Sequence, residues 1–156
     1  MKEVTLLFLI KPDSREILLA MKKRGFGEGK FNGTGGKVEA TETSKQATVR
    51  EAKEEIGVDV SEDDLVEVAD ITFLFENKPD WSFHCIAYTT THWEGEPSES
   101  EEMAPQWFSF DEIPYERMWV DDKYWLPQVL ESKKLNAIFH FSEDANAVLS
   151  QKITDR

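Results

Sequence analysis

The stretch GGKVEATETSKQATVREAKEEIGV, residues 35–58, decides the fold. It opens with two glycines, passes through the hydroxyl-rich TETS and ends at another glycine. Thr41 or Thr43 is the expected N-cap of a helix over residues 41–57, and Gly57 its expected end. The sequence therefore predicts a glycine-rich turn that leads directly into a capped helix.

One face of the predicted helix carries three carboxylates. At 100° per residue, Glu54 and Glu55 lie roughly 60° and 40° to either side of Glu51, and aliphatic residues lie opposite. An exposed acidic face costs only about 0.2–0.5 kcal/mol per like-charge pair, so the pattern alone fits a solvated surface. The alternative is a site for Mg²⁺, a hard ion that takes carboxylate oxygens and shares its shell with substrate phosphates.

Spacing separates the two alternatives. Gly36 is followed by five residues and Glu42, then by seven residues and Arg50, which opens REAKEEIGV. These residues resemble the Nudix box, G-x5-E-x7-R-E-U-x-E-E-x-G-U with U a bulky aliphatic residue, at every charged and glycine position. Seven fixed residues match by chance in about one window per 10⁸. Ala52 departs from the pattern, at a position expected to face the core.

Nudix hydrolases cleave nucleoside diphosphates linked to another group, with a divalent metal held by the glutamates of the box. The resemblance implies an α/β (α+β) fold for residues 1–156 as one domain, with a mixed sheet between helices and a catalytic loop-helix-loop. It implies Mg²⁺ as the cofactor, with Mn²⁺ able to substitute. Arg50 would orient a glutamate, and Glu55 or Glu102 would position or deprotonate the attacking water. The implied metal ligands are Glu51, Glu54, Glu55, Glu102 and the backbone carbonyl of Gly35 or Gly36.

The charge balance limits the partners. With 31 acidic and 18 basic residues, the chain carries a formal net charge of −13. Such a surface repels nucleic acid and anionic membranes at long range, so neither is an expected partner. An anionic substrate would need a metal bridge or a local basic patch. The loop that begins at Lys22 has a basic excess, which is either solvated or directed at the substrate. Its basic residues near the predicted site are Lys22, Lys23, Arg24 and Lys30.

The remaining elements predict alternating strands and short helices. Residues 111–119 and 124–134 are expected to be short helices, and Pro127 is expected to keep the second from starting much before Trp125. The tail, residues 145–156, fits a strand or a helix. Residues 22–37 are expected to form a loop. The predicted strands are residues 4–10, 16–22, 65–77, 81–91, 104–110 and 136–141. The first two are expected to pair as a hairpin, and the third and fourth as a second, longer hairpin.

A second resemblance covers nearly the whole chain. Residues 21–39, 102–134 and 139–141 are similar to eukaryotic 8-oxo-purine nucleoside triphosphatases, a branch of the Nudix hydrolases. Phe31 and Thr34 stand where those enzymes have tryptophan and phenylalanine, so base preference is expected to depend on them. The resemblance assigns substrate binding to an asparagine, aromatic walls, a strand threonine, a lysine and an aspartate pair. These residues are Thr5, Lys22, Phe26, Asn32, Phe73, Trp119, Asp121 and Asp122.

The aspartate pair lies in WVDDKYW, residues 119–125, among aromatic residues. Asp often caps a helix, so a cap is one interpretation. The other is base recognition, in which Trp119 stacks on a purine and two neighbouring carboxylates in a dry pocket share one proton. The pair then offers one donor and one acceptor. Moving the proton reverses the pattern, which would allow one pocket to bind oxidised guanine or oxidised adenine.

The sequence thus predicts a Mg²⁺-dependent pyrophosphohydrolase that converts oxidised purine nucleoside triphosphates, such as 8-oxo-dGTP and 2-oxo-dATP, to the monophosphate and pyrophosphate. The alternatives are another Nudix substrate, such as ADP-ribose, a dinucleoside polyphosphate or unmodified dNTP, or a module that senses nucleotide without cleaving it. The single cysteine, Cys85, is expected to be a buried thiol in a reducing compartment. No apolar run approaches the roughly 20 residues of a membrane span. We therefore expect a cytoplasmic monomer whose partner is a small-molecule nucleotide.

Overall fold

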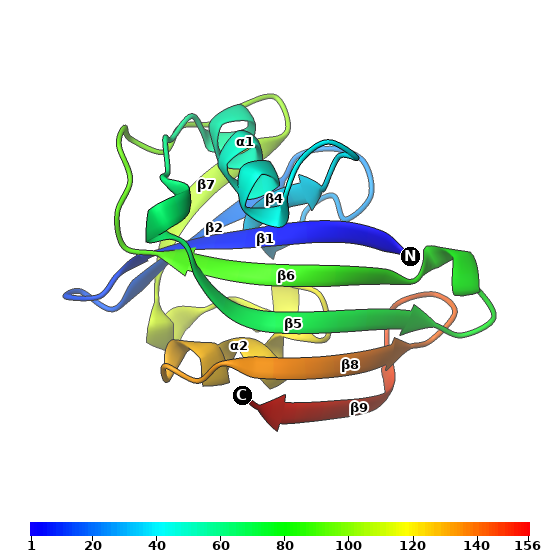
Figure 1. Ribbon diagram of the computed structural model, residues 1–156. Helices are drawn as coiled ribbons and strands as arrows, with labels where there is room; N and C mark the ends of the chain where they lie inside the picture. Colours follow the sequence, from blue (N-terminus) through cyan, green and yellow to red (C-terminus); the bar gives the residue numbers. More distant parts are fainter.

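A mixed nine-stranded sheet with a helix on each face forms the protein, for which the computed structural model describes residues 1–156 (Figure 1). The strand order is β3-β2-β1-β6-β5-β8-β9, with β4 paired to β1 and β7 paired to β2. Neither helix is long and apolar enough to cross a bilayer. The strands are β1 Lys2–Lys11, β2 Glu16–Lys22, β3 Phe31–Asn32, β4 Thr34–Lys37, β5 Val66–Phe75, β6 Phe83–Thr90, β7 Met103–Ser109, β8 Leu135–Phe141 and β9 Val148–Asp155; the helices are α1 Ser44–Ile56 and α2 Asp122–Leu130.

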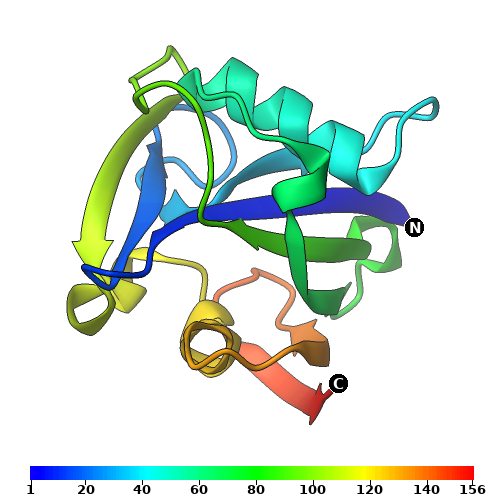
Figure 2. The ribbon, with the colours of Figure 1, turned by 60° about the vertical axis from the view of Figure 1, so that its left-hand side comes forward.

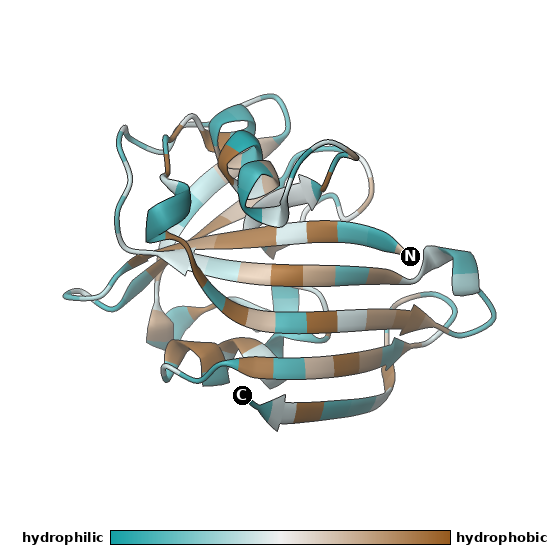
Figure 3. Cartoon of the chain, viewed as in Figure 1, coloured by the Kyte–Doolittle hydropathy of each residue, from teal (hydrophilic) through white to brown (hydrophobic).

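Alternation along β1 divides the core into two clusters. Leu7 and Leu9 belong to the cluster beneath α1, which also contains Ile56. Phe8 belongs to the other cluster, and its ring lies 6.1 Å from that of Trp125 in α2. Successive side chains of a strand point to opposite faces, so β1 is buried from both sides. Apolar bands on β1, β6 and β5 in Figure 3 correspond to this double burial.

The predicted helix is confirmed as α1. Thr43 is its N-cap and accepts a hydrogen bond from the backbone N–H of Gln46, whose side chain accepts from the Thr43 N–H, a complete capping box. Gly57 ends the helix with a φ of 73°. Ala52 is fully buried. The small side chain at this position of the Nudix box therefore lies in the interface between α1 and the sheet.

The first predicted hairpin is confirmed only near its turn. β1 and β2 pair at Ile10–Ile17 and Lys11–Glu16, after which β2 continues against β7. The same edge of β1 is taken by β4 over residues 4–7, so the pairing of β2 with β1 cannot extend there. Figure 2 shows β2 and β7 at a steep angle to β1 and β6. The predicted loop over residues 22–37 therefore contains two short strands, β3 and β4.

Two helix predictions are wrong. Residues 111–119 form short 3₁₀ turns at 110–112 and 115–117 instead of a helix, because Pro114 separates them. Helix α2 begins at Asp122, earlier than Pro127 was expected to allow. The proline removes one backbone donor, whereas Trp125 and Leu126 are fully buried, so packing outweighs the lost hydrogen bond. The hairpin of β5 and β6 is confirmed, and the tail is a strand, β9.

Gly35 is the position where the close approach of β4 to β1 leaves least room. A Cβ on Gly35 would lie 1.8 Å from the carbonyl oxygen of Thr5, and its φ is 154°. We predict that Gly35→Ala lowers the free energy of unfolding by about 3 kcal/mol or more, because backbone must move to relieve the clash. Gly29→Ala is the control: it has the positive φ of 84° with open space around it, and should cost about 1–2 kcal/mol. Equal losses in urea unfolding would contradict the steric account.

Candidate active site

The acidic face of α1 lies against the two glycines of β4. The Glu55 carboxylate accepts a hydrogen bond of 2.8 Å from the Gly35 N–H. A Cβ on Gly36 would be 2.7 Å from Oε1 of Glu51. Glycine at both positions thus lets two carboxylates approach the backbone of the preceding strand directly.

Burial raises the pKa of both carboxyl groups. The pKa of Glu55 is raised to about 8, mainly by burial, and the nearby charges of Glu51 and Glu102 raise it further, against the Gly35 hydrogen bond. Burial also raises the pKa of Glu51, although the Arg50 hydrogen bond lowers it. Glu102 lies near enough to act on Glu55 but forms an ion pair with Arg24, at 3.7 Å. Three of the predicted glutamates therefore gather at one place.

Arg50 holds the other glutamates of the motif. Its guanidinium donates to Oε1 of Glu42 at 2.6 Å, to Oε1 of Glu51 at 2.9 Å and to Oε2 of Glu54 at 3.3 Å. It also donates to the Lys37 carbonyl oxygen at 3.1 Å. The Arg50 hydrogen bond lowers the pKa of Glu42. Glu42, which the motif contains but which was given no role from the sequence, is thus the main partner that fixes the arginine.

The carboxylate oxygens are chemically suited to a hard divalent cation, but in this structure they do not converge on one point. No three His, Cys, Asp or Glu side chains have a geometry that could hold a metal ion. Glu54 is exposed and directed to Arg50. Glu55 is buried and Glu51 is half-buried, and the pKa values of both carboxyl groups rise because burial makes their charge costly. A divalent cation would offset that cost, and rotation of Glu54 and Glu102 away from their arginines would complete the set.

A cavity of about 570 Å³ lies next to these carboxylates. Lys22, at the end of β2, lies at its rim, and the two glycines of β4 lie on its wall. The structure therefore brings together residues that the sequence places more than a hundred positions apart. The cavity is lined by every predicted substrate-binding residue, namely Thr5, Lys22, Phe26, Asn32, Phe73, Trp119, Asp121 and Asp122.

Aromatic rings form the wall of the cavity. The Trp119 ring lies 5.1 Å from that of Phe26, with 33° between the planes. Phe26 in turn meets Trp81 edge to face at 6.4 Å. Phe73, which also lines the cavity, stacks on Phe83 at 4.7 Å. Phe26 and Trp81 are exposed, so a flat ligand packed against these rings would bury more of their surface.

The aspartate pair lies at the buried end of the cavity. Asp121 and Asp122 are 3% and 2% exposed. Oδ2 of Asp121 accepts a hydrogen bond of 2.8 Å from Nε1 of Trp125, whereas Oδ2 of Asp122 has no partner. Asp121 occupies the N-cap position of α2, but its side chain makes no capping hydrogen bond. The cap interpretation therefore fails, and the unpartnered oxygen points to a ligand.

Burial of the pair favours one shared proton. It raises the pKa of Asp121 to about 6, and it raises that of Asp122 well above the usual range, together with the negative charge of Asp121. Two adjacent carboxylates without a nearby cation cannot both ionise in such surroundings. At neutral pH the pair therefore presents one carboxylate and one carboxylic acid.

Several residues take roles that the sequence did not predict. The Thr5 hydroxyl is hydrogen bonded to that of Thr48 in α1, so it is not directed at the aspartates. Phe31 is buried against Phe108 and lies outside the cavity, as does Thr34, so their departures from the resembled pattern do not change the cavity wall. Cys85 is buried, as expected, but it also lines the cavity. Cys85 lies two residues after Phe83 on β6 and therefore shares its face of the sheet. This spacing is the sequence signal that places Cys85 at the cavity.

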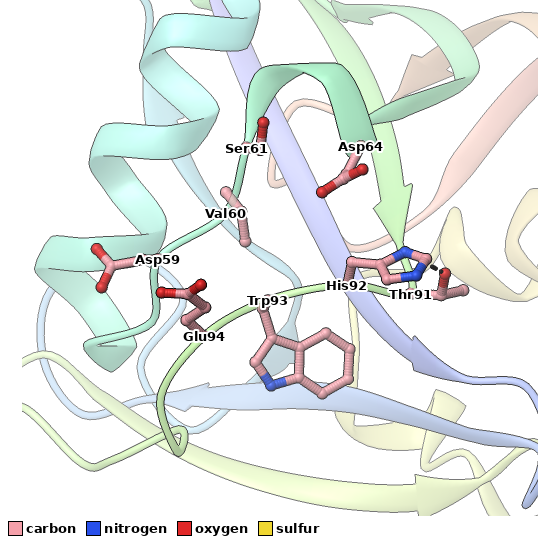
Figure 4. A pocket seen from close by; sticks show the side chains of 8 residues that line it. All are labelled: Asp59, Val60, Ser61, Asp64, Thr91, His92, Trp93 and Glu94. Carbon is pink, nitrogen blue, oxygen red and sulfur yellow. Dashed lines mark hydrogen bonds between the residues drawn. The ribbon is translucent and has the colours of Figure 1, made fainter.

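A second hollow, of about 600 Å³, lies at the end of α1 (Figure 4). Its lining contains three carboxylates and no lysine or arginine, so it is unsuited to an anionic ligand. None of the predicted site residues contributes to it. The lining residues are Asp59, Val60, Ser61, Asp64, Thr91, His92, Trp93 and Glu94.

Fold and site together define an α/β protein in which a glycine-containing strand and a carboxylate-bearing helix lie beside a ligand cavity. The chain matches the NUDIX domain over residues 1–129 and belongs to this family. It is 42% identical to the oxidized purine nucleoside triphosphate hydrolase of Mus musculus, over 97% of this chain and 93% of the mouse protein. The protein of the same name in Danio rerio is 44% identical, over 90% of this chain and 86% of its own. A MutT protein from Bacillus halodurans has a similar structure, with a TM-score of 0.84 at 27% identity, covering 98% of this chain and 97% of that chain.

The aspartate pair should make stability depend on pH. Because its folded pKa values lie above the unfolded value of about 3.9, its contribution is greatest below about pH 4 and is lost as pH rises through about 6. We predict that the double variant Asp121→Asn/Asp122→Asn gains at least about 2–3 kcal/mol relative to the wild type between pH 4 and pH 7, because Asp121 alone accounts for that much and Asp122 adds to it. Urea unfolding of both proteins without metal measures this difference. A difference that stays constant with pH would contradict the shared-proton account.

Proposed function

We propose that this protein hydrolyses oxidised purine nucleoside triphosphates, such as 8-oxo-dGTP and 2-oxo-dATP, to the monophosphate and pyrophosphate, and so removes damaged precursors from the nucleotide pool. The observation that carries the proposal is the buried aspartate pair, with one unpartnered oxygen, in a cavity whose wall includes Gly35 and Gly36, the two glycines that Glu55 and Glu51 approach. The names of the mouse and zebrafish relatives support the same substrate class.

The cavity is suited to a flat base with polar edges. Trp119 and Phe73 supply apolar surfaces for its faces. Asp121 and Asp122, with one proton between them, supply a donor and an acceptor for its edge, and Asn32 adds an amide. An unmatched edge would leave these buried groups unpaired, which is a strong basis for discrimination. Moving the proton between the aspartates would adapt the same pocket to oxidised guanine or oxidised adenine.

Mg²⁺, replaceable by Mn²⁺, completes the proposed site. Glu51, Glu54, Glu55 and Glu102 would hold it, with a backbone carbonyl of Gly35 or Gly36. The ion supplies Lewis-acid polarisation of the phosphates and activates water. It would also bridge an enzyme of net charge −13 to an anionic substrate.

The chain's own residues prepare the hydrolysis. Arg50 fixes Glu51 and Glu54 on one side of α1. Glu55 or Glu102 would position or deprotonate the attacking water. Burial raises the pKa of Glu55 to about 8 in the metal-free protein, and a bound cation would lower it, so that the carboxylate could accept a proton near neutral pH. Water then bonds to the β-phosphorus as the bond to the α–β bridging oxygen breaks, releasing nucleoside monophosphate and pyrophosphate. Lys22 at the rim can neutralise part of the phosphate charge.

A cytoplasmic, monomeric enzyme is part of the proposal. The one cysteine is a free thiol, and it is buried, which is compatible with a reducing compartment. The edge strand β9 carries charged and polar side chains, including Lys152 and Asp155, and these disfavour pairing with a second copy.

A substrate panel tests the reaction. With Mg²⁺, we predict turnover of 8-oxo-dGTP and 2-oxo-dATP at kcat/KM values well above those of dGTP and ADP-ribose, with monophosphate and pyrophosphate as products. Glu55→Gln should lower kcat by about 10² or more, because an amide cannot accept the proton. Chromatographic quantification of the products measures the kcat/KM values of the wild type and the kcat of Glu55→Gln. Preference for ADP-ribose, or absence of turnover with every substrate, would contradict the proposal.

Single substitutions in the pair test base recognition separately from catalysis. We predict that Asp122→Asn changes the ratio of kcat/KM for 8-oxo-dGTP and 2-oxo-dATP by about tenfold or more, because asparagine fixes the donor that the shared proton otherwise moves. Asp121→Asn should shift the ratio in a different way, since Trp125 holds that side chain. Equal losses on both substrates would instead indicate a structural role.

A further inference from the structure

The four cations near the glycine-rich loop fall into two groups. Lys23 bonds the Glu99 carboxylate and donates to the Ser100 carbonyl oxygen at 2.9 Å, while Arg24 pairs with the acidic loop over residues 95–102. Lys22 and Lys30 form no ion pair and no side-chain hydrogen bond. Both line the cavity. Of these four cations, the two that line the cavity are therefore the two without a carboxylate partner.

Lys30 has a fixed backbone and an ammonium group with no polar partner. Its N–H donates to the Gly27 carbonyl oxygen, and its own carbonyl oxygen accepts from the Lys22 N–H, both at 3.0 Å. The Nζ atom lies 5.2 Å from the centroid of the Trp119 ring, a cation–π contact. The residue is half-buried. The free protein thus keeps a positive charge at the ring on which the base is proposed to stack.

We infer that Lys30 is a phosphate-binding residue of this enzyme, whose ammonium rests on Trp119 in the free protein and contacts a non-bridging phosphate oxygen in the complex. The inference rests on the proposed function. A base that stacks on Trp119 takes the ring face from the ammonium, which then needs an anionic partner. The phosphate chain of the same ligand supplies that partner, because the other anions of the cavity, Asp121 and Asp122, are occupied by the base edge.

Base stacking and phosphate binding are coupled in this arrangement. A nucleoside would displace the ammonium from Trp119 without offering it an anionic partner. A nucleotide would displace it and give it a charge-assisted hydrogen bond, which is stronger than a neutral one. Lys30 therefore favours phosphorylated ligands over free nucleosides in the same base pocket.

Matched variants test the inference. Lys30→Met keeps the length of the side chain and removes its charge, Lys30→Arg keeps the charge, and Lys11→Met is the control, because Lys11 lies 4.1 Å from the Trp107 ring, outside the cavity. Binding of 8-oxo-dGMP, a non-hydrolysable 8-oxo-dGTP analogue and 8-oxo-deoxyguanosine is measured by calorimetry without metal, and KM for 8-oxo-dGTP with Mg²⁺.

The expected result is selective. Lys30→Met should weaken binding of the triphosphate analogue by about tenfold and raise KM for 8-oxo-dGTP by about tenfold. Its affinity for the nucleoside should change less than about twofold. Lys30→Arg should restore most of the lost affinity. Equal weakening of nucleoside and nucleotides would show that Lys30 only supports Trp119 and would overturn the inference. No change with any ligand would also overturn it. Failure of the proposed function is distinguishable, because the wild type itself would then neither bind nor hydrolyse these compounds.

Discussion

The close approach of β4 to β1 is the constraint on which the site depends. Thr5 pairs with Gly36 and Leu6 with Gly35, and no side chain larger than hydrogen fits between the strands at Gly35. The same two glycines receive the carboxylates of α1, through the Gly35 N–H and the space beside Gly36. A shift of β4 would therefore move the acidic face of α1 relative to the cavity.

Helix α1 is attached to this strand pair through small and hydroxyl-bearing residues. Ala47 and Ala52 are fully buried, so the helix axis lies close to the sheet. The Thr48 hydroxyl bonds that of Thr5, and the Ser44 hydroxyl bonds that of Tyr88 at 2.5 Å. Thr48 lies on the same face of the helix as Glu51 and Glu55, three and seven residues before them. These contacts fix the distance of the helix from the sheet and its rotation about its own axis. They therefore fix the direction in which its glutamates point.

The sequence predicted the parts of the site that are set by local spacing. The helix, its Thr43 cap and its Gly57 end follow from a few neighbouring residues, and all three are confirmed. The failures are non-local. β2 leaves β1 because β4 competes for the same edge, and α2 starts before Pro127 because Trp125 packs into the core. The Trp125–Asp121 hydrogen bond could not be predicted for the same reason, since it requires knowing that both residues are buried.

The two carboxylate pairs differ in what can relieve their negative charge. Glu55 is buried and Glu51 is half-buried beside Arg50, so burial disfavours ionisation of both and a divalent cation would relieve the repulsion. Asp121 and Asp122 are buried without an ion pair, so a proton would relieve their repulsion instead. A basic residue beside the aspartates would favour ionisation of both, and would remove the hydrogen-bond donor that the proposed base recognition requires.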